Sequence, residues 1–126
     1  MKKLLAVSAL LSVLAPSVAL AKPMSQIDKL FISDYHSLIA NISDVNVRQI
    51  LKSSAQRHPE HSIEQAKAVC KLLQVGGSMD EVRQVEMENL PSSDDEPDLY
   101  NAGVEDSAIV NTLALEHFCP QFKGRE

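Results

Sequence analysis

The stretch from Ser62 to Gly77 reads SIEQAKAVCKLLQVGG and is the clearest helix in the sequence. Its first four residues match a capping box, in which Ser62 accepts a backbone hydrogen bond and Gln65 reaches back to the cap. At the other end, Gly76 and Gly77 predict a left-handed termination. One face of this helix is apolar and consists of Ile63, Ala66, Val69, Cys70 and Leu73. The sequence therefore predicts an amphipathic helix that carries a cysteine on its buried face.

A second capping box follows directly. Ser78 and Glu81 repeat the serine–acid spacing, so we expect another helix that runs to about Asn89. Its predicted apolar face is short and consists of Met79, Val82 and Val85.

Two further helices are predicted on the N-terminal side. The first covers about Ser25–Ile42, and the second covers about Asp44–Arg57. The second must stop near His58, because Pro59 disfavours helical geometry in the residue before it. The apolar face of the first consists of Ile27, Phe31, Tyr35, Leu38 and Ile42. The apolar face of the second consists of Val47, Ile50 and Leu51.

The C-terminal third begins with an acidic segment. Pro91–Asn101 is poor in apolar residues and rich in Asp and Glu, which predicts a solvated loop. A last helix is expected from about Glu105 to Phe118, with Glu105 and Asp106 at its positive end. Its core face consists of Ile109, Val110, Leu113, Ala114 and Phe118. No useful strand-like alternation occurs, so we predict an all-α fold, a small bundle of about five helices closed by one disulfide and preceded by a signal peptide.

The N-terminus has the pattern of a cleavable export signal of bacterial type. Lys2 and Lys3 precede an apolar stretch, and Ala19-Leu20-Ala21 places small residues before Lys22. We expect residues 1–21 to be a signal peptide cleaved between Ala21 and Lys22, which leaves residues 22–126 as one helical domain. The alternative is an uncleaved membrane anchor, because Leu4–Ala21 approaches spanning length.

The chain has two cysteines, Cys70 and Cys119. In an oxidising compartment an isolated pair is most simply a disulfide. Such a bond would join the middle of the chain to the end of the last helix. The alternative is a pair of free thiols or a redox pair, although the Cys-x-x-Cys spacing of redox motifs is missing.

The chain resembles the family known as domain of unknown function 732. The resemblance rests on the helical pattern A-x-x-V-C-x-x-L at Ala66–Leu73, on Gly76-Gly77, and on the ending Phe118-Cys119-Pro120. It spans about Phe31–Gln121. It implies a small exported helical protein with a disulfide between the two cysteines, and it brings no established activity or functional residues. The acidic insertion at Ser92–Asp98 and a lower alanine content depart from the family pattern.

Charge limits the classes of partner. The chain has 12 basic and 17 acidic residues, and loss of Lys2 and Lys3 on cleavage leaves ten against 17, a formal charge of −7. Nucleic acids and anionic lipids require clustered Lys or Arg, so both are unfavourable partners. Tryptophan is absent from the sequence, which disfavours a stacking platform for bases or sugars.

Two segments could bind metal. His58-Pro59-Glu60-His61 offers two imidazoles and a carboxylate, and His36 and His117 could join them only through the tertiary fold. The acidic run Asp94–Asp98 could attract Ca²⁺, although it has neither the ligand alternation nor the central glycine of an EF-hand. We interpret the first segment as a polar turn and the second as a solvated loop.

No catalytic, cofactor or metal site is therefore predicted. We expect a non-catalytic binding or interaction module of the cell envelope or exterior, whose partner is an envelope or extracellular protein. We expect no nucleic-acid partner and no membrane span in the mature chain. The alternatives are a small metal-assisted exported enzyme that uses His58 and His61, and a lipid-binding helical domain.

Overall fold

A computed structural model describes residues 24–124 of the chain. Within this range all the regular structure is helical, which confirms the predicted all-α class. The α-helices are α2 (Gln26–Ala40), α3 (Val45–Arg57), α4 (His61–Gln74), α5 (Met79–Glu88) and α6 (Pro97–Leu113). The predicted signal peptide and its cleavage site between Ala21 and Lys22 lie outside the described residues. In the described part, no helix combines the length and the apolar character needed to cross a membrane.

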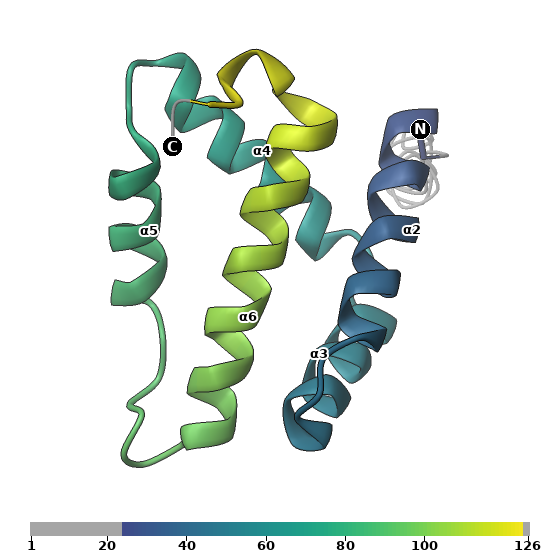
Figure 1. The fold of residues 1–126 in the computed structure, drawn as a ribbon, viewed down its shortest axis with the longest axis vertical. Coiled ribbons are helices and arrows are strands. Elements are labelled where there is room, and N and C mark those ends of the chain that lie inside the picture. Colours follow the sequence, from purple (N-terminus) through teal and green to yellow (C-terminus); the bar gives the residue numbers. More distant parts are fainter. Residues whose placement is uncertain (1–23, 125–126) are drawn as a thin grey trace, which may run out of the picture.

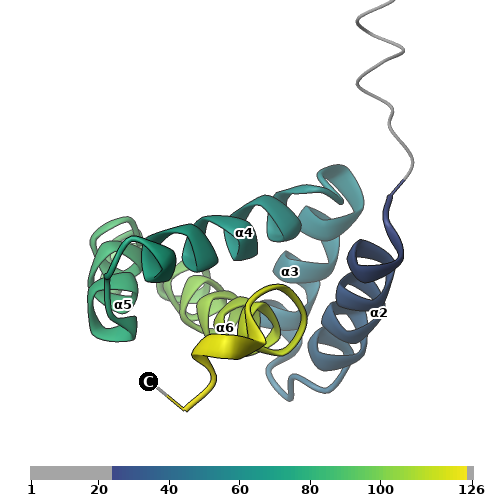
Figure 2. The same ribbon diagram turned by 90° about the horizontal axis from the view of Figure 1, so that it is seen from above.

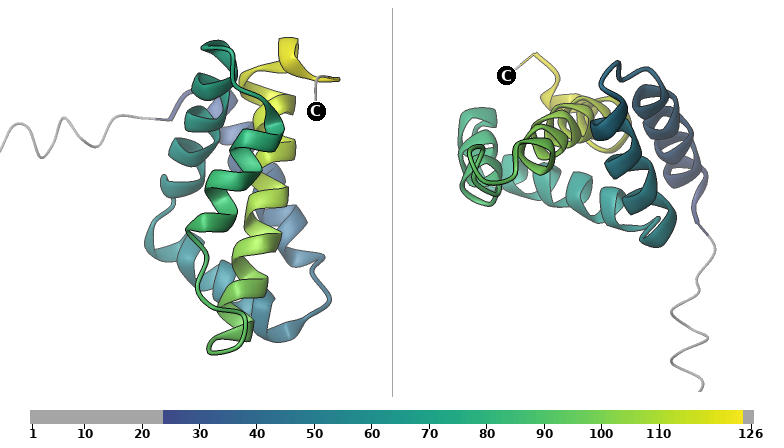
Figure 3. Two further views of the ribbon diagram at one scale, coloured as in Figure 1. Left: turned by 90° about the vertical axis from the view of Figure 1, so that its left-hand side faces the viewer. Right: turned by 90° about the horizontal axis from the view of Figure 1, so that it is seen from below.

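The longest helix, α6, occupies the middle of the bundle (Figure 1). Helices α2 and α3 pack on one side of it, and α5 packs on the opposite side. Helix α4 crosses over α6 and connects these two sides, as the view from above shows (Figure 2). Figure 3 shows from two further directions that α5 stands beside α4 and α6, away from α2 and α3. The three helices α4, α5 and α6 therefore form their own corner of the bundle.

Helix α2 confirms the predicted apolar face only in part: Phe31 and Tyr35 lie in the core as predicted, whereas Ile39 is buried in place of Leu38. Phe31, Tyr35 and Ile39 are buried, in a row spaced by four residues. Ile27 and Leu38 were predicted in the core, but they are exposed. The helix ends at Ala40. Ile42, the last residue of the predicted apolar face, therefore lies beyond the helix. The row through Ile39 points toward the centre of the bundle, where α6 and α3 lie.

Helix α4 confirms the predicted apolar face but not the predicted capping box. All five predicted core residues of this helix are buried. The helix begins at His61, with Glu60 as the cap and no side-chain capping bond, so Ser62 already lies inside it. A serine inside the first turn cannot occupy the cap position, and Ser62 is instead buried. Gly76 adopts the left-handed conformation with φ of 98°, which confirms the predicted termination.

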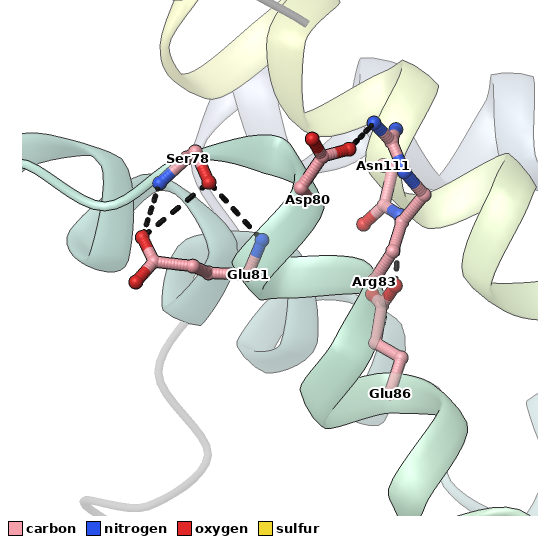
Figure 4. A network of polar contacts seen from close by, with 6 residues as sticks. All are labelled: Ser78, Asp80, Glu81, Arg83, Glu86 and Asn111. Carbon is pink, nitrogen blue, oxygen red and sulfur yellow. Dashed lines mark hydrogen bonds and ion pairs between the residues drawn. The ribbon is translucent and has the colours of Figure 1, made fainter.

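Helix α5 begins as predicted. The hydroxyl of Ser78 accepts a hydrogen bond from the Glu81 backbone N–H, and the Glu81 carboxylate accepts one from the Ser78 N–H (Figure 4). Met79 and Val82 are buried, whereas Val85 remains 52% exposed, so its predicted core position is wrong. Only two apolar side chains of this helix therefore lie fully in the core.

The start of α6 is a second correction. We expected the acidic loop to reach Asn101 and the helix to begin near Glu105, but the helix begins at Pro97. A proline at the first helical position loses no hydrogen bond, and Asp98 in the first turn is stabilised by the helix dipole. Glu105 and Asp106 therefore lie in the middle of α6 and not at its positive end.

The end of α6 carries the predicted disulfide. Beyond Leu113 the helix widens into a π-helical turn, Ala114–Phe118, whose last backbone bond joins the Cys119 N–H to the Ala114 carbonyl. Cys119 is bonded to Cys70 of α4, and both residues are buried. The chain then makes a 3-10 turn at Pro120–Phe122. The bond fixes the C-terminal end of α6 against the middle of α4.

Candidate functional site

A cleft lies between α4, α5 and α6, and we call it the α4–α6 cleft. It has a volume of about 350 Å³, which falls at the lower end of the range of small-molecule sites. Its apolar lining consists of Ala68, Val69, Leu72, Val82, Val85, Leu90 and Gly103. Its polar lining consists of His61, Gln65, Glu86, Asn89, Asp106 and Ser107. The walls are thus mainly hydrocarbon, with acids contributed by two facing helices.

Asp106 is the most enclosed acid of the cleft. The Tyr35 hydroxyl donates a hydrogen bond of 2.5 Å to its Oδ1, which ties α2 to α6. Burial raises the pKa of Asp106, while hydrogen bonds from Tyr35 and Gln65 and the charge of His61 act in the opposite direction. Burial also raises the pKa of Tyr35, and the nearby Asp106 charge raises it further. Tyr35 therefore stays a neutral donor to this carboxyl group.

Glu86 is the second acid and comes from α5. Its Oε1 accepts a hydrogen bond of 2.9 Å from the Asn111 side-chain amide of α6 (Figure 4). Burial raises the pKa of Glu86, the Asn111 bond lowers it, and the charge of Asp106 raises it again. The two carboxyl groups therefore repel each other across the cleft when both are ionised.

Both acids occupy positions where the helical period calls for apolar residues. On α6, Asp106 lies between Ala102 and Ile109 on the buried stripe. On α5, Glu86 follows Val82 by four residues, one turn further along the buried face. The sequence predicted Asp106 at the start of the last helix, and neither acid was predicted as a site residue. The signal that could have found them is an acid that interrupts an apolar stripe.

Glycine at position 103 shapes one wall of the cleft. A side-chain carbon at this position would overlap the Cδ2 methyl of Leu90. Gly103 therefore lets Leu90, from the connection after α5, lie directly against α6. Both residues line the cleft.

Of the predicted histidine segment His58–His61, only His61 lines the α4–α6 cleft. His58 ends α3, His61 begins α4, and both line a small cavity of about 110 Å³ with Tyr35 and Asp106. His61 also lines the α4–α6 cleft, whereas Glu60 is exposed. Among residues 24–124, no group of three or more His, Cys, Asp or Glu side chains is arranged to hold a metal ion.

Ser107, His61 and Asp106 share the cleft, which invites comparison with a catalytic triad. A serine nucleophile needs a hydrogen bond to its base. In the part of the chain that the structure describes, the side-chain hydrogen bonds include none between Ser107 and His61. The arrangement therefore has the residue types of a triad without its central contact.

The acidic segment forms a compact turn. The Ser92 hydroxyl accepts hydrogen bonds from the backbone N–H groups of Asp94 and Asp95. Asp98 accepts a bond of 3.2 Å from the Asn46 side chain, which joins the start of α6 to the start of α3. Asp94 and Asp95 thus lie in a turn, and Asp98 lies in the first turn of α6.

Comparison with known proteins adds no relative. Neither a family model, nor a curated protein, nor a solved structure matches this chain. The resemblance to domain of unknown function 732 stays a prediction from sequence motifs.

Proposed function

We propose that this chain is an exported, non-catalytic binding module whose ligand occupies the α4–α6 cleft. The observation that carries the proposal is the cleft itself, a cavity of about 350 Å³ with apolar walls and a few convergent polar groups. This combination is typical of ligand sites. This volume favours a small ligand. A partner helix, which is about 10–12 Å in diameter with its side chains, would need a larger groove.

Export is part of the proposal. Residues 1–21 supply the signal pattern, and the buried disulfide between Cys70 and Cys119 is of the kind that persists in oxidising compartments. The resemblance to domain of unknown function 732 points the same way. The intact mass of the protein recovered after export should equal that of residues 22–126 with one disulfide. A mass that retains residues 1–21 would contradict this part.

Ligand binding can be tested by nuclear magnetic resonance. We would titrate a library of small fragments into the oxidised, isotope-labelled protein and follow the backbone amide signals. The proposal predicts that the fragments that bind shift the amides of Ala68, Leu72 and Gly103. Shifts confined to other surfaces, or a library without a binder, would remove its basis.

A pair of alanines provides matched variants for this experiment. Ala68 on α4 lines the cleft, and Ala108 on α6 lines a different hollow on the far side of α6 and α5. Both are exposed, so a larger side chain fits at either position without disturbing the core. Ala68→Phe should abolish fragment binding, and Ala108→Phe should leave it intact.

The non-catalytic part has its own test. The protein should not accelerate hydrolysis of p-nitrophenyl acetate beyond the background rate. Turnover that disappears in Ser107→Ala or His61→Ala would show that the cleft is an active site.

A further inference from the structure

We propose that the α4–α6 cleft binds a small organic cation, namely a primary amine carried on a short apolar chain. The inference rests on the proposed function and adds the chemical class of the ligand. Three properties of the cleft carry it: the sign of its charge, the unused hydrogen-bond acceptors in its lining and the apolar character of its walls.

The charge of the cleft is negative. Glu86 and Asp106 face it from two different helices, and no Lys or Arg stands among its described lining residues. Among the residues of 24–124 that line the cleft, His61 is the only basic group, and it acts on Asp106. Arg83 acts on Glu86 from outside the cleft and is itself paired with Asp80 at 2.9 Å (Figure 4). A cation placed between the two carboxylates would replace their mutual repulsion by two attractions.

Two of the residues that line the cleft, Glu86 and Gln65, each carry one acceptor atom without a donor. The Oε2 atom of Glu86 and the Oε1 atom of Gln65 are buried, and no donor among the described residues reaches either of them. Buried acceptors of this kind are rare unless something pairs with them. An ammonium group has three donors and no acceptor, so it suits this lining. An anionic ligand would bring further acceptors, and its charge would be repelled by Glu86 and Asp106.

The walls determine the remainder of the ligand. Aliphatic side chains from α4, from α5 and from the connection after α5 surround the acids, and they include Val69, Leu72, Val82 and Leu90. Burial of an alkyl chain against them is favourable by about 0.8 kcal/mol per CH₂ group. A fully hydrated ion such as Na⁺ gains nothing from such walls. The lining therefore favours an alkylamine over an inorganic cation.

Three probes with the same number of carbon atoms separate the effect of the ligand's charge from that of its alkyl chain. Isothermal titration calorimetry of the oxidised protein would compare hexylamine, 1-hexanol and hexanoate at about pH 7, where the amine is protonated. Because a charged hydrogen bond is stronger than a neutral one, hexylamine should bind about tenfold or more tightly than 1-hexanol, and hexanoate should bind more weakly than either. Equal affinity for hexylamine and 1-hexanol would overturn the inference.

Variants assign the effect to the two acids. Glu86→Gln keeps an acceptor for Asn111, and Asp106→Asn keeps an acceptor for Tyr35, so each preserves its hydrogen bond to that partner. Each should weaken hexylamine binding by about tenfold and leave 1-hexanol binding unchanged. The controls remove the same charge nearby: Glu88→Gln on α5 and Glu105→Gln on α6, where both acids are exposed and outside the cleft. If the controls weaken hexylamine as strongly as the cleft variants, general surface charge explains the binding and the inference fails.

The outcomes separate this inference from the proposed function. If 1-hexanol binds as well as hexylamine and Ala68→Phe abolishes both, the cleft is a ligand site and only the cationic class is wrong. If all three probes bind without any effect of Ala68→Phe, the site lies elsewhere and both proposals fall.

Discussion

Reduction of the disulfide between Cys70 and Cys119 should lower the stability of the fold markedly. The bond joins residues separated by 49 positions, so it closes a loop that contains α5 and α6. In the chain-entropy account, a loop of this length restricts the unfolded chain enough to stabilise the fold by about 4 kcal/mol. A domain of this size has a total free energy of unfolding of about 5–15 kcal/mol. The bond therefore supplies a large share of the stability.

The assay is urea unfolding followed by circular dichroism, with the protein oxidised or fully reduced. With an m-value of about 1–3 kcal/mol/M, a loss of about 4 kcal/mol lowers the midpoint by about 1–4 M urea. The double variant Cys70→Ala/Cys119→Ala is the control for the reductant, because its midpoint should not respond to reduction. Its own stability should be at or below that of the reduced parent, since the substitution also removes two buried sulfur atoms.

A reduced protein that unfolds within about 1 kcal/mol of the oxidised one would refute the reasoning, because the loop would then impose little constraint on the unfolded chain. A midpoint shift in the double variant on addition of reductant would refute it differently, since the effect would not come from the bond.

Three smaller effects follow from individual side chains. Ile39→Ala should lower the free energy of unfolding by about 2–5 kcal/mol in urea titrations, because Ile39 is buried. The side chain of Leu38 is 38% exposed, so Leu38→Ala should lower this free energy by well under half as much. Equal losses would contradict the observed face of α2. Ser78→Ala should cost about 1 kcal/mol in the same assay, through loss of the cap of α5, and no change would mean that the cap contributes nothing. Because burial raises the pKa of Asp106 in the folded state, its contribution to stability is full in acid and is lost as the pH rises through that pKa. The stability of Asp106→Asn relative to the parent should therefore increase between about pH 4 and about pH 7, whereas that of Glu105→Gln should show no such trend. If the stability of Asp106→Asn and of the parent changed with pH in the same way, the raised pKa of Asp106 would be contradicted.

Much of the fold follows from local sequence signals. The apolar face of α4 was predicted in full because five residues fix one helical register. The cap at Ser78 was predicted from its spacing to Glu81, and it forms because the glycines before it end the preceding helix and leave a free N-terminus to be capped. The similar pattern at Ser62 failed because the connection after Pro59 is short and helix α4 has already begun. A capping motif is thus informative only where the chain is free to start a helix.

The errors in α2 and α6 have a tertiary origin. In α2, two overlapping apolar stripes were available, and the packing of α6 and α3 selected the one through Ile39. In α6, a polar and acidic composition suggested a loop, yet Pro97 suits the first turn of a helix and Asp98 bonds to Asn46 of α3. Composition alone does not contain that contact between distant segments.

The candidate site was beyond sequence reasoning for a related reason. Glu86 and Asp106 are ordinary surface residues by type, and the chain has 17 acids from which to choose. Their positions on the buried stripes of α5 and α6 were a usable signal. Their meeting across one cleft was not, because it depends on how α5 packs against α6. Sequence indicated the helices, and the fold brought the acids together.

The α4–α6 cleft as the ligand site can be tested most directly by locating a bound probe. Hexylamine in complex with carbon-13-labelled protein would be studied by nuclear Overhauser spectroscopy between ligand and protein protons. The alkyl protons should give cross-peaks to the methyl groups of Leu72, Val82 and Leu90, which line the cleft. Cross-peaks only to methyl groups elsewhere, such as those of Leu38 and Val104 in the hollow between α2 and α6, would show that the cleft is not the site.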